Sequence, residues 1–284
     1  MGGVHPGTVA ATGGAAQAGM DDGRWTALVL AGQRPGVDPL AAHFGQEWKA
    51  LVPLTGDAML THVLRTLHAA PAIGRIIILA QTPGALQSAI DAGGGGEVAV
   101  SQSGISASIR GVAGAMADWP VLVVTADHPL LTPAMIADFV AKLADAGRED
   151  AVDVAIAMVE RANMLARFPH AQRTWLRFAD GAWSGANLFA LTNERAYRAL
   201  DIWAQAEQDR KKPWKLFRHF GWMLAIRAVT RTIGLRDALA QAGRRMGVAA
   251  HLVAMDDPVA AIDVDKLADH QQAAHLLHDR AGRG

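Results

Sequence analysis

Residues 27–61, ALVLAGQRPGVDPLAAHFGQEWKALVPLTGDAMLT, indicate the fold of this chain most directly. A short apolar run at 27–30 ends abruptly at Ala31-Gly32, and a loop with glycine and proline follows, with Arg34 early and Lys49 late. The chain is expected to turn again at Thr55-Gly56-Asp57 before a helical pattern begins. Glycine lets backbone N–H groups approach an anion, and the two cations offset its charge. The stretch therefore predicts a strand that opens into a mobile glycine loop able to wrap polyphosphate.

The composition limits the class of protein. At 284 residues and 51% hydrophobic, the chain can bury a sizeable core. Lys+Arg and Asp+Glu number 27 each, and this zero net charge argues against a general nucleic-acid binder. The absence of cysteine excludes disulfides and thiolate metal sites, and it fits a reducing cytoplasm.

The ends of the chain add two expectations. Residues 1–24 are rich in Gly, Ala and Thr and lack the apolar region of a secretory signal, so they predict a disordered N-terminal extension. No run of about 18 uncharged apolar residues occurs, so no transmembrane helix is expected. A cytoplasmic location follows as the expectation.

Apolar, β-branched runs alternate with helical patterns through the first half of the chain. They predict strands at 27–30, 75–80, 97–101 and 121–125 and helices at 58–69, 85–92 and 106–117. Thr132-Pro133 predicts the N-cap and first position of a further helix that runs to about residue 146. Such short uncharged strands imply a parallel sheet covered on both faces, with the ligand at the carboxyl ends of the strands.

The second half of the chain is less regular. A strand is predicted at 152–160, and strands at 174–178 and 184–191 are predicted to pair across the turn at Asp180-Gly181. A helix at 193–208, a last strand at 248–254 and a closing helix at 264–278 complete the prediction. No linker separates two cores, so we expect one domain over 25–284 with a helical insertion at about 193–247.

The segment 121–132, VLVVTADHPLLT, carries a carboxylate at a strand end. Asp127 in this place, beside a phosphate site, is a candidate Mg²⁺ ligand, because Mg²⁺ takes one or two carboxylates together with phosphate oxygens. The alternative is an aspartate that caps the following turn. His128 is expected to be a turn residue rather than a catalyst.

The loop lacks the Walker and dinucleotide patterns. Instead, Leu30-Ala31-Gly32, Arg34, Lys49-Ala50-Leu51, Gly56 and Met59-Leu60 resemble the signature of the nucleotidyltransferases related to molybdenum cofactor guanylyltransferase, the MobA-like NTP transferases. The resemblance implies a Rossmann-like α/β fold of the GT-A type, with a mostly parallel central sheet and helices on both faces. The family's usual loop is LAGG-x-G-x-R-M followed by Pro-Lys. Here Gln33 replaces the second glycine, and Trp48 replaces the proline before the lysine.

The resemblance also implies roles for individual residues. Lys49, Arg34 and Asp127 would be catalytic, and the residues expected to bind the nucleotide phosphates are Leu30, Ala31, Gly32, Gln33 and Arg34. The segment 263–269, DVDKLAD, resembles the family's closing D-x-D-T-x-x-D motif, so Asp263 would be the second Mg²⁺ ligand beside Asp127. The pairing of the two aspartates rests on the expectation that each follows an apolar strand. The residues alone also allow helix N-terminal carboxylates favoured by the macrodipole, which is the role expected of Asp269.

Two further polar segments are candidates for substrate contact. Ser106 and Ser108 follow the strand at 97–101, where the family recognises the base; the alternative is an ordinary helix N-cap at Ser106. Asn187 lies in the segment 184–189, where related proteins contact the acceptor, and a strand-edge polar residue is the equal alternative.

The segment 210–245 holds ten Lys or Arg and one acid, so its net charge is +9 and that of the rest of the chain is −9. It also carries several aromatic residues. A basic segment mixed with aromatics can lie on an anionic membrane surface. It could equally cover the acceptor pocket and hold a phosphate, or form helices that pack on the core with solvated cations.

Together these features predict a Mg²⁺-dependent nucleotidyltransferase that uses an NTP, with CTP or GTP favoured, and a small phosphorylated acceptor, and that releases pyrophosphate. No nucleic-acid partner is expected. One alternative is a GT-A-type glycosyltransferase that uses a nucleotide-sugar, which would show D-x-D where this chain has Asp127-His128-Pro129. Another is a non-catalytic, membrane-associated nucleotide-binding protein.

Overall fold

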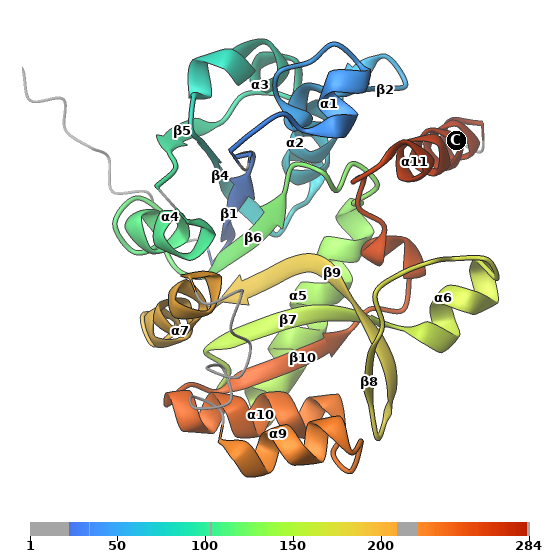
Figure 1. The fold of residues 1–284 in the computed structure, drawn as a ribbon. Coiled ribbons are helices and arrows are strands. Elements are labelled where there is room, and N and C mark those ends of the chain that lie inside the picture. The colour runs from blue at the N-terminus through green and yellow to red at the C-terminus, as the bar shows by residue number, and fades with distance from the viewer. Residues whose placement is uncertain (1–22, 34, 103, 209–220, 283–284) are drawn as a thin grey trace, which may run out of the picture.

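The computed structural model describes residues 23–33, 35–102, 104–208 and 221–282. One eight-stranded sheet, with the strand order β10-β7-β9-β6-β1-β4-β5 and β8 paired to β9, runs through it (Figure 1). Its strands are β1 Trp25–Leu30, β4 Ile73–Ala80, β5 Glu97–Val100, β6 Val121–Thr125, β7 Val154–Glu160, β8 Leu176–Phe178, β9 Gly181–Leu191 and β10 Ala250–Ala254. A separate hairpin pairs β2 Pro53–Leu54 with β3 Asp57–Ala58.

Helices connect the strands. They are α1 Pro39–His43, α2 Met59–Ala69, α3 Gln87–Ala92, α4 Ile105–Val112, α5 Pro133–Glu149, α6 Arg161–Arg167, α7 Ala196–Gln208, α9 Trp222–Val229, α10 Leu235–Met246 and α11 Leu267–Ala281. Three short 3₁₀ helices are η1 Lys49–Leu51, η2 Pro83–Leu86 and η3 Pro258–Ala261. Among the described residues, no helix has both the length and the apolar character needed to cross a membrane.

The predicted fold class, a mostly parallel sheet with helices on both faces, is confirmed. β1 runs parallel to β4 and β6, β4 to β5, and β7 to β10, whereas β9 is antiparallel to both of its neighbours. Alternate residues of β1 face opposite sides of the sheet. Ala27 and Val29 join the core that contains residues of α2 and α5, while Leu28 joins the core that contains residues of α4 and α7.

Several local predictions are confirmed. Thr132 caps α5, because its hydroxyl accepts a hydrogen bond from the Met135 N–H at 3.2 Å. β8 and β9 pair as predicted, although the turn between them lies at Ala179-Asp180, one residue earlier than expected. Thr55 and Gly56, with φ of 51° and 100°, turn the chain between β2 and β3, where sequence reasoning placed a turn.

Three local expectations were wrong. The helix predicted at 106–117 ends at Val112, because Ala113 is extended and Gly114 takes a φ of 73°. The glycine loop contains α1, which Asp38 caps by accepting hydrogen bonds from two backbone N–H groups at 2.9 and 3.0 Å. Asp263 follows η3 rather than an apolar strand.

The insertion between β9 and β10 contains α7, α9 and α10. After it, β10 returns to the same sheet and pairs with β7. A single domain over 25–284 with an insertion at about 193–247 stays a prediction. Residues 1–22, within the expected N-terminal extension, and residues 209–220 lie outside the described part of the chain.

Candidate active site

The ends of four neighbouring strands form the candidate site. Because β5, β4, β1 and β6 are parallel, their carboxyl ends lie along one edge of the sheet. Backbone hydrogen bonds continue beyond the strands: Ala31 N donates to Leu79 O at 2.9 Å, and Ala126 N donates to Leu30 O at 3.0 Å. The residues that follow these strands are therefore held side by side, among them Gly32 and Asp127.

Gln33 organises the loop after β1. Its backbone N–H and C=O pair with the side-chain amide of Gln81, at 3.0 and 2.8 Å. Its own side chain accepts from the Lys49 N–H at 2.9 Å and donates to Glu47 O at 3.0 Å. A Cβ at Gly32 would lie 3.1 Å from the Gln81 side-chain amide, so there is little room for a side chain at this position. Gln33 thus links the start of the loop after β1 to Lys49 at its end. The sequence showed only that Gln33 replaces a glycine of the family and did not predict this role.

Lys49 reaches the end of β6. It begins η1, directly after Trp48, which is partly buried against the main core. Its ammonium Nζ lies 2.6 Å from Asp127 Oδ2 and 2.5 Å from Asp265 Oδ1. Burial alone would lower the pKa of Lys49, but the two carboxylates outweigh it and raise the pKa above its ordinary value. The lysine is therefore a fixed positive charge at neutral pH.

The structure brings Asp127 and the 263–265 segment together. Val264 N donates to the backbone oxygen of Asp127 at 2.9 Å. The Asp263 carboxylate accepts from Arg173 Nη2 at 2.5 Å and from Asn187 Nδ2 at 3.1 Å. Burial would raise the pKa of Asp263, yet Arg173 and the hydrogen bonds lower it below its ordinary value. Asp263 is therefore held ionised.

Arg173 is a site residue that sequence reasoning missed. It lies between α6 and β8, belongs to no motif, and also donates to the backbone oxygen of Ala261. Its side chain is 18% exposed, so most of it is buried beside Asp263. In the sequence, Arg173 is one arginine in a segment without clear periodicity, and this is too little to identify it as a candidate site residue.

A bulge directs Asn187 toward Asp263. Its φ of 51° is left-handed, a conformation that asparagine adopts more readily than most residues. The pairing of β7 with β9 shifts register between Ile156 and Met158, opposite this part of β9. Bulges re-aim side chains next to functional sites. The position of Asn187 thus follows from tertiary pairing rather than from an edge location.

His128 is the expected turn residue. Its N–H donates to Thr125 O, and its carbonyl accepts from Leu131 N. The side chain is 1% exposed, and neither ring nitrogen has a hydrogen-bond partner. Burial lowers the pKa of His128 to about 4, although the nearby Asp127 and Asp263 charges oppose the shift. The imidazole is therefore neutral and shielded from solvent at neutral pH.

The two candidate serines lie after β5. Gly104, not Ser106, is the N-cap of α4, so the N-cap alternative for Ser106 is wrong. The Ser106 hydroxyl donates to Glu207 Oε2 at 3.0 Å. The Ser108 hydroxyl accepts from Gln102 N and donates to Gly104 O, both at 2.7 Å, which leaves it little capacity for a ligand.

The closing segment holds the lysine loop in place. Asp269 accepts from the N–H groups of Asp265 and Lys266, each at 3.2 Å, which confirms its expected role at the start of α11. The His270 ring forms a hydrogen bond with Pro53 O at 2.7 Å and packs at a tilt against the Phe44 ring, with the ring centroids 4.4 Å apart. α11 therefore couples Asp265 to the segment that carries Lys49.

The carboxylates beside Lys49 are the candidate ligands for Mg²⁺. Within the described ranges, no group of three or more His, Cys, Asp or Glu side chains could hold a metal ion. Asp127 Oδ1 is nevertheless buried without a partner, and the Asp265 side chain is 65% exposed. Mg²⁺ needs only one or two carboxylates when phosphates and water complete its shell, so these oxygens fit the ion. The two Asp263 oxygens each accept one of these side-chain hydrogen bonds, from Arg173 and from Asn187, and a carboxylate oxygen has a second lone pair that can meet an ion.

A lysine between two carboxylates at the carboxyl edge of a mostly parallel sheet is consistent with an α/β transferase of the nucleotidyltransferase type. The profile of the MobA-like NTP transferase domain matches residues 27–245. The chain belongs to that family. Arg34, which the family resemblance places among the catalytic residues, lies outside the described residues.

Solved structures share the fold. A hypothetical transferase from Thermus thermophilus has a TM-score of 0.72 and 27% identity, covering 87% of this chain and 99% of that one. A 4-diphosphocytidyl-2C-methyl-D-erythritol synthase from Anaerococcus prevotii has a TM-score of 0.55 and 12% identity, over 90% and 97%. A CMP:2-keto-3-deoxy-manno-octonic acid synthetase complexed with CTP has a TM-score of 0.52 and 16% identity, over 90% and 99%. No relative among curated proteins matches the chain.

Proposed function

We propose that this protein transfers a nucleoside monophosphate from an NTP to a small phosphorylated acceptor and releases pyrophosphate. The observation that carries the proposal is the contact of 2.6 Å between Lys49 Nζ and Asp127 Oδ2 at the carboxyl edge of the sheet. Family membership supports NTP as the donor. The edge where this pair lies is where open α/β sheets bind ligands.

The reaction needs little acid–base chemistry. An oxygen of the acceptor phosphate forms a bond to the α-phosphorus, and the bond from that phosphorus to the bridging oxygen breaks. The electron pair leaves on pyrophosphate. Because the acceptor phosphate is already ionised at neutral pH, positioning and charge neutralisation matter more than a strong base. His128 is buried and neutral and has no part in proton transfer.

Each loop residue has a proposed task. Lys49 neutralises charge that develops at the α-phosphate, for which its raised pKa suits it. Backbone groups of Leu30, Ala31, Gly32 and Gln33 line the polyphosphate. Arg34, outside the described residues, is proposed to hold the β- and γ-phosphates on sequence resemblance alone.

The carboxylates are proposed to hold Mg²⁺. Asp127 Oδ1 has no partner and would be one ligand, and Asp263 would be the second, with Arg173 and Asn187 holding its carboxylate in place. Mg²⁺ supplies neutralisation of phosphate charge when bound. Asn187, beside Asp263, is proposed on the family resemblance to contact the acceptor.

Cytidine or guanosine triphosphate is the proposed donor. Two of the structural neighbours are, by their names, a diphosphocytidyl synthase and a CMP synthetase complexed with CTP, which supports CTP over GTP in this proposal. Ser106 and Ser108, at the start of α4, lie on the proposed nucleoside side.

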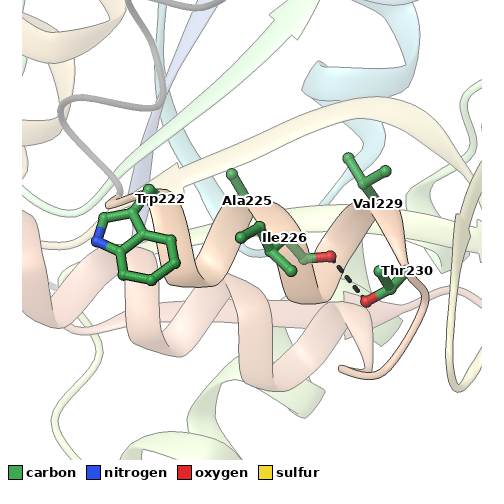
Figure 2. A pocket seen from close by; sticks show the side chains of 5 residues that line it. All are labelled: Trp222, Ala225, Ile226, Val229 and Thr230. Carbon is green, nitrogen blue, oxygen red and sulfur yellow. Dashed lines mark hydrogen bonds between the residues drawn. The ribbon is translucent and has the colours of Figure 1, made fainter.

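We also propose that the protein is cytoplasmic and that its basic segment 210–245 makes peripheral contact with the inner face of an anionic membrane. α9 supports this contact: Figure 2 shows Trp222, Ala225, Ile226, Val229 and Thr230 around a shallow hollow on this helix. Its exposed apolar side chains are Trp222, Met223, Ile226 and Val229. Residues 210–220 lie outside the described part. Flotation with anionic and with neutral liposomes tests the contact, and failure to float with anionic lipid would contradict it.

A pyrophosphate-release screen tests the catalytic proposal. The purified chain is incubated with Mg²⁺, each of the four NTPs, and a panel of phosphorylated sugars and polyols, with nucleotide-sugars as a separate arm. We expect pyrophosphate from CTP or GTP in the presence of one class of acceptor. Release of nucleoside diphosphate from a nucleotide-sugar, without pyrophosphate from any NTP, would indicate a glycosyltransferase instead.

A further inference from the structure

A second carboxylate lies at the same edge of the sheet, outside the lysine cluster. α4 and α7 pack side by side and run in opposite directions (Figure 1). At one end of the pair, Arg110 Nη1 lies 3.1 Å from Asp201 Oδ1, and the Tyr197 hydroxyl donates to Ala113 O. At the other end, Ser106 donates to Glu207 Oε2 at 3.0 Å. Because α4 begins just after β5 ends, Glu207 lies at the carboxyl edge, on the β5 side.

Glu207 has an unused hydrogen-bonding atom. Its Oε1 is buried and has no partner among the described residues, and the hydroxyl of Ser101, directly after β5, is in the same condition. Buried polar atoms in native proteins are normally paired, and an unpaired one is costly. Two orphan atoms on neighbouring segments therefore indicate a ligand that supplies their partners.

We propose that Glu207 selects the nucleobase, with Oε1 accepting a hydrogen bond from an exocyclic amino group while Ser106 holds Oε2. This inference rests on the proposed use of an NTP. An ionised carboxylate only accepts hydrogen bonds, and glutamate is a suitable partner for the amino group of cytosine. Uracil has a carbonyl oxygen in the place of that amino group. This oxygen and Glu207 Oε1 are both acceptors, so no hydrogen bond could form between them.

A purely structural role for Glu207 predicts something different. Its Oε2 lies beside the N-terminus of α4, 2.7 Å from where a Cβ on Gly104 would be, and a carboxylate there stabilises the helix. Loss of such support would disturb the β5–α4 loop for every nucleotide alike. Base selection instead changes the affinities of the four NTPs unequally.

The test measures binding of CTP, GTP, ATP and UTP by calorimetry, for the full chain and for Glu207→Gln. Glutamine has nearly the same shape; its oxygen can keep the Ser106 bond while its NH₂ group faces the base. We expect the wild-type protein to prefer an amino-bearing NTP over UTP, and Glu207→Gln to reduce that preference at least about tenfold. Glu194 is exposed and lies just before the start of α7, at the opposite end of the helix from Glu207. Glu194→Gln is therefore the matched control and should leave the preference unchanged.

Three results would overturn the inference. One is that Glu207→Gln loses affinity equally for all four NTPs, which would indicate that Glu207 only stabilises the start of α4. Another is that Glu207→Gln keeps the wild-type preference among the NTPs. The third is that its loss of affinity disappears when 2′-deoxynucleotides are used, which would indicate a contact with the ribose. Equal melting temperatures of the two variants show that both fold. A protein that binds NTPs selectively but releases no pyrophosphate with any acceptor would contradict the proposed function and leave the assignment of Glu207 intact.

Discussion

The buried imidazole beside Asp127 makes the stability of the protein dependent on pH. His128 has a pKa of about 4 in the folded protein and an ordinary value of 6.5 when unfolded. Between these values the unfolded chain binds a proton that the folded chain does not, so the free energy of unfolding falls as the pH drops through this window. From pH 7 to pH 5 the loss from this residue is about 2 kcal/mol.

Urea unfolding at pH 7 and pH 5 measures this loss. The wild-type protein and His128→Gln are compared, and the drop in unfolding free energy should be about 2 kcal/mol smaller in the variant. His275→Gln removes an imidazole whose side chain is 76% exposed and serves as the matched control. If buried glutamine prevents folding, His128→Leu gives the same comparison. An equal pH dependence in the wild-type protein and the His128 variants would refute the buried, neutral imidazole.

Three further substitutions test other parts of the structure. Lys49→Met should reduce pyrophosphate release at saturating NTP about a hundredfold, because the charge near the α-phosphate is lost; unchanged turnover would contradict its role. Gln33→Ala removes both side-chain bonds of the loop and should raise KM for NTP about tenfold with little change in melting temperature, whereas an unchanged KM would show that the loop orders without them. Thr132→Ala should lower the unfolding free energy by about 1 kcal/mol in urea, and no change would contradict the cap seen at α5.

The strands β1, β4 and β6 could be predicted closely because they are buried on both faces, unlike the largely exposed edge strand β5. Such strands appear in the sequence as short apolar runs bounded by turn residues, and β6 occupies the range predicted for it. Asp127 was found in the same way, since a polar residue after such a run marks the carboxyl edge. The meeting of Asp127 with the 263–265 segment required the family resemblance, because nothing local joins residues so far apart.

Other parts of the site depend on tertiary contacts that no local pattern encodes. Arg173 and Asn187 reach Asp263 across separations of 90 and 76 residues, and the bulge that aims Asn187 arises from its pairing with β7. Asp38-Pro39 did carry a helix-start signal for α1. That helix has only five residues, too few for a periodic pattern, so its stability comes from its cap and its two buried residues.

The central claim is that Asp127 and Lys49 form a metal-assisted nucleotidyl transfer site, and Asp127→Asn tests it most directly. Pyrophosphate release is measured with the NTP and acceptor found in the screen, over a Mg²⁺ titration. Asp145→Asn, on α5 with its side chain 69% exposed, is the control. We predict that Asp127→Asn lowers release at least about a hundredfold while Asp145→Asn matches the wild-type protein. Full, Mg²⁺-dependent activity in Asp127→Asn would contradict the assignment of the site.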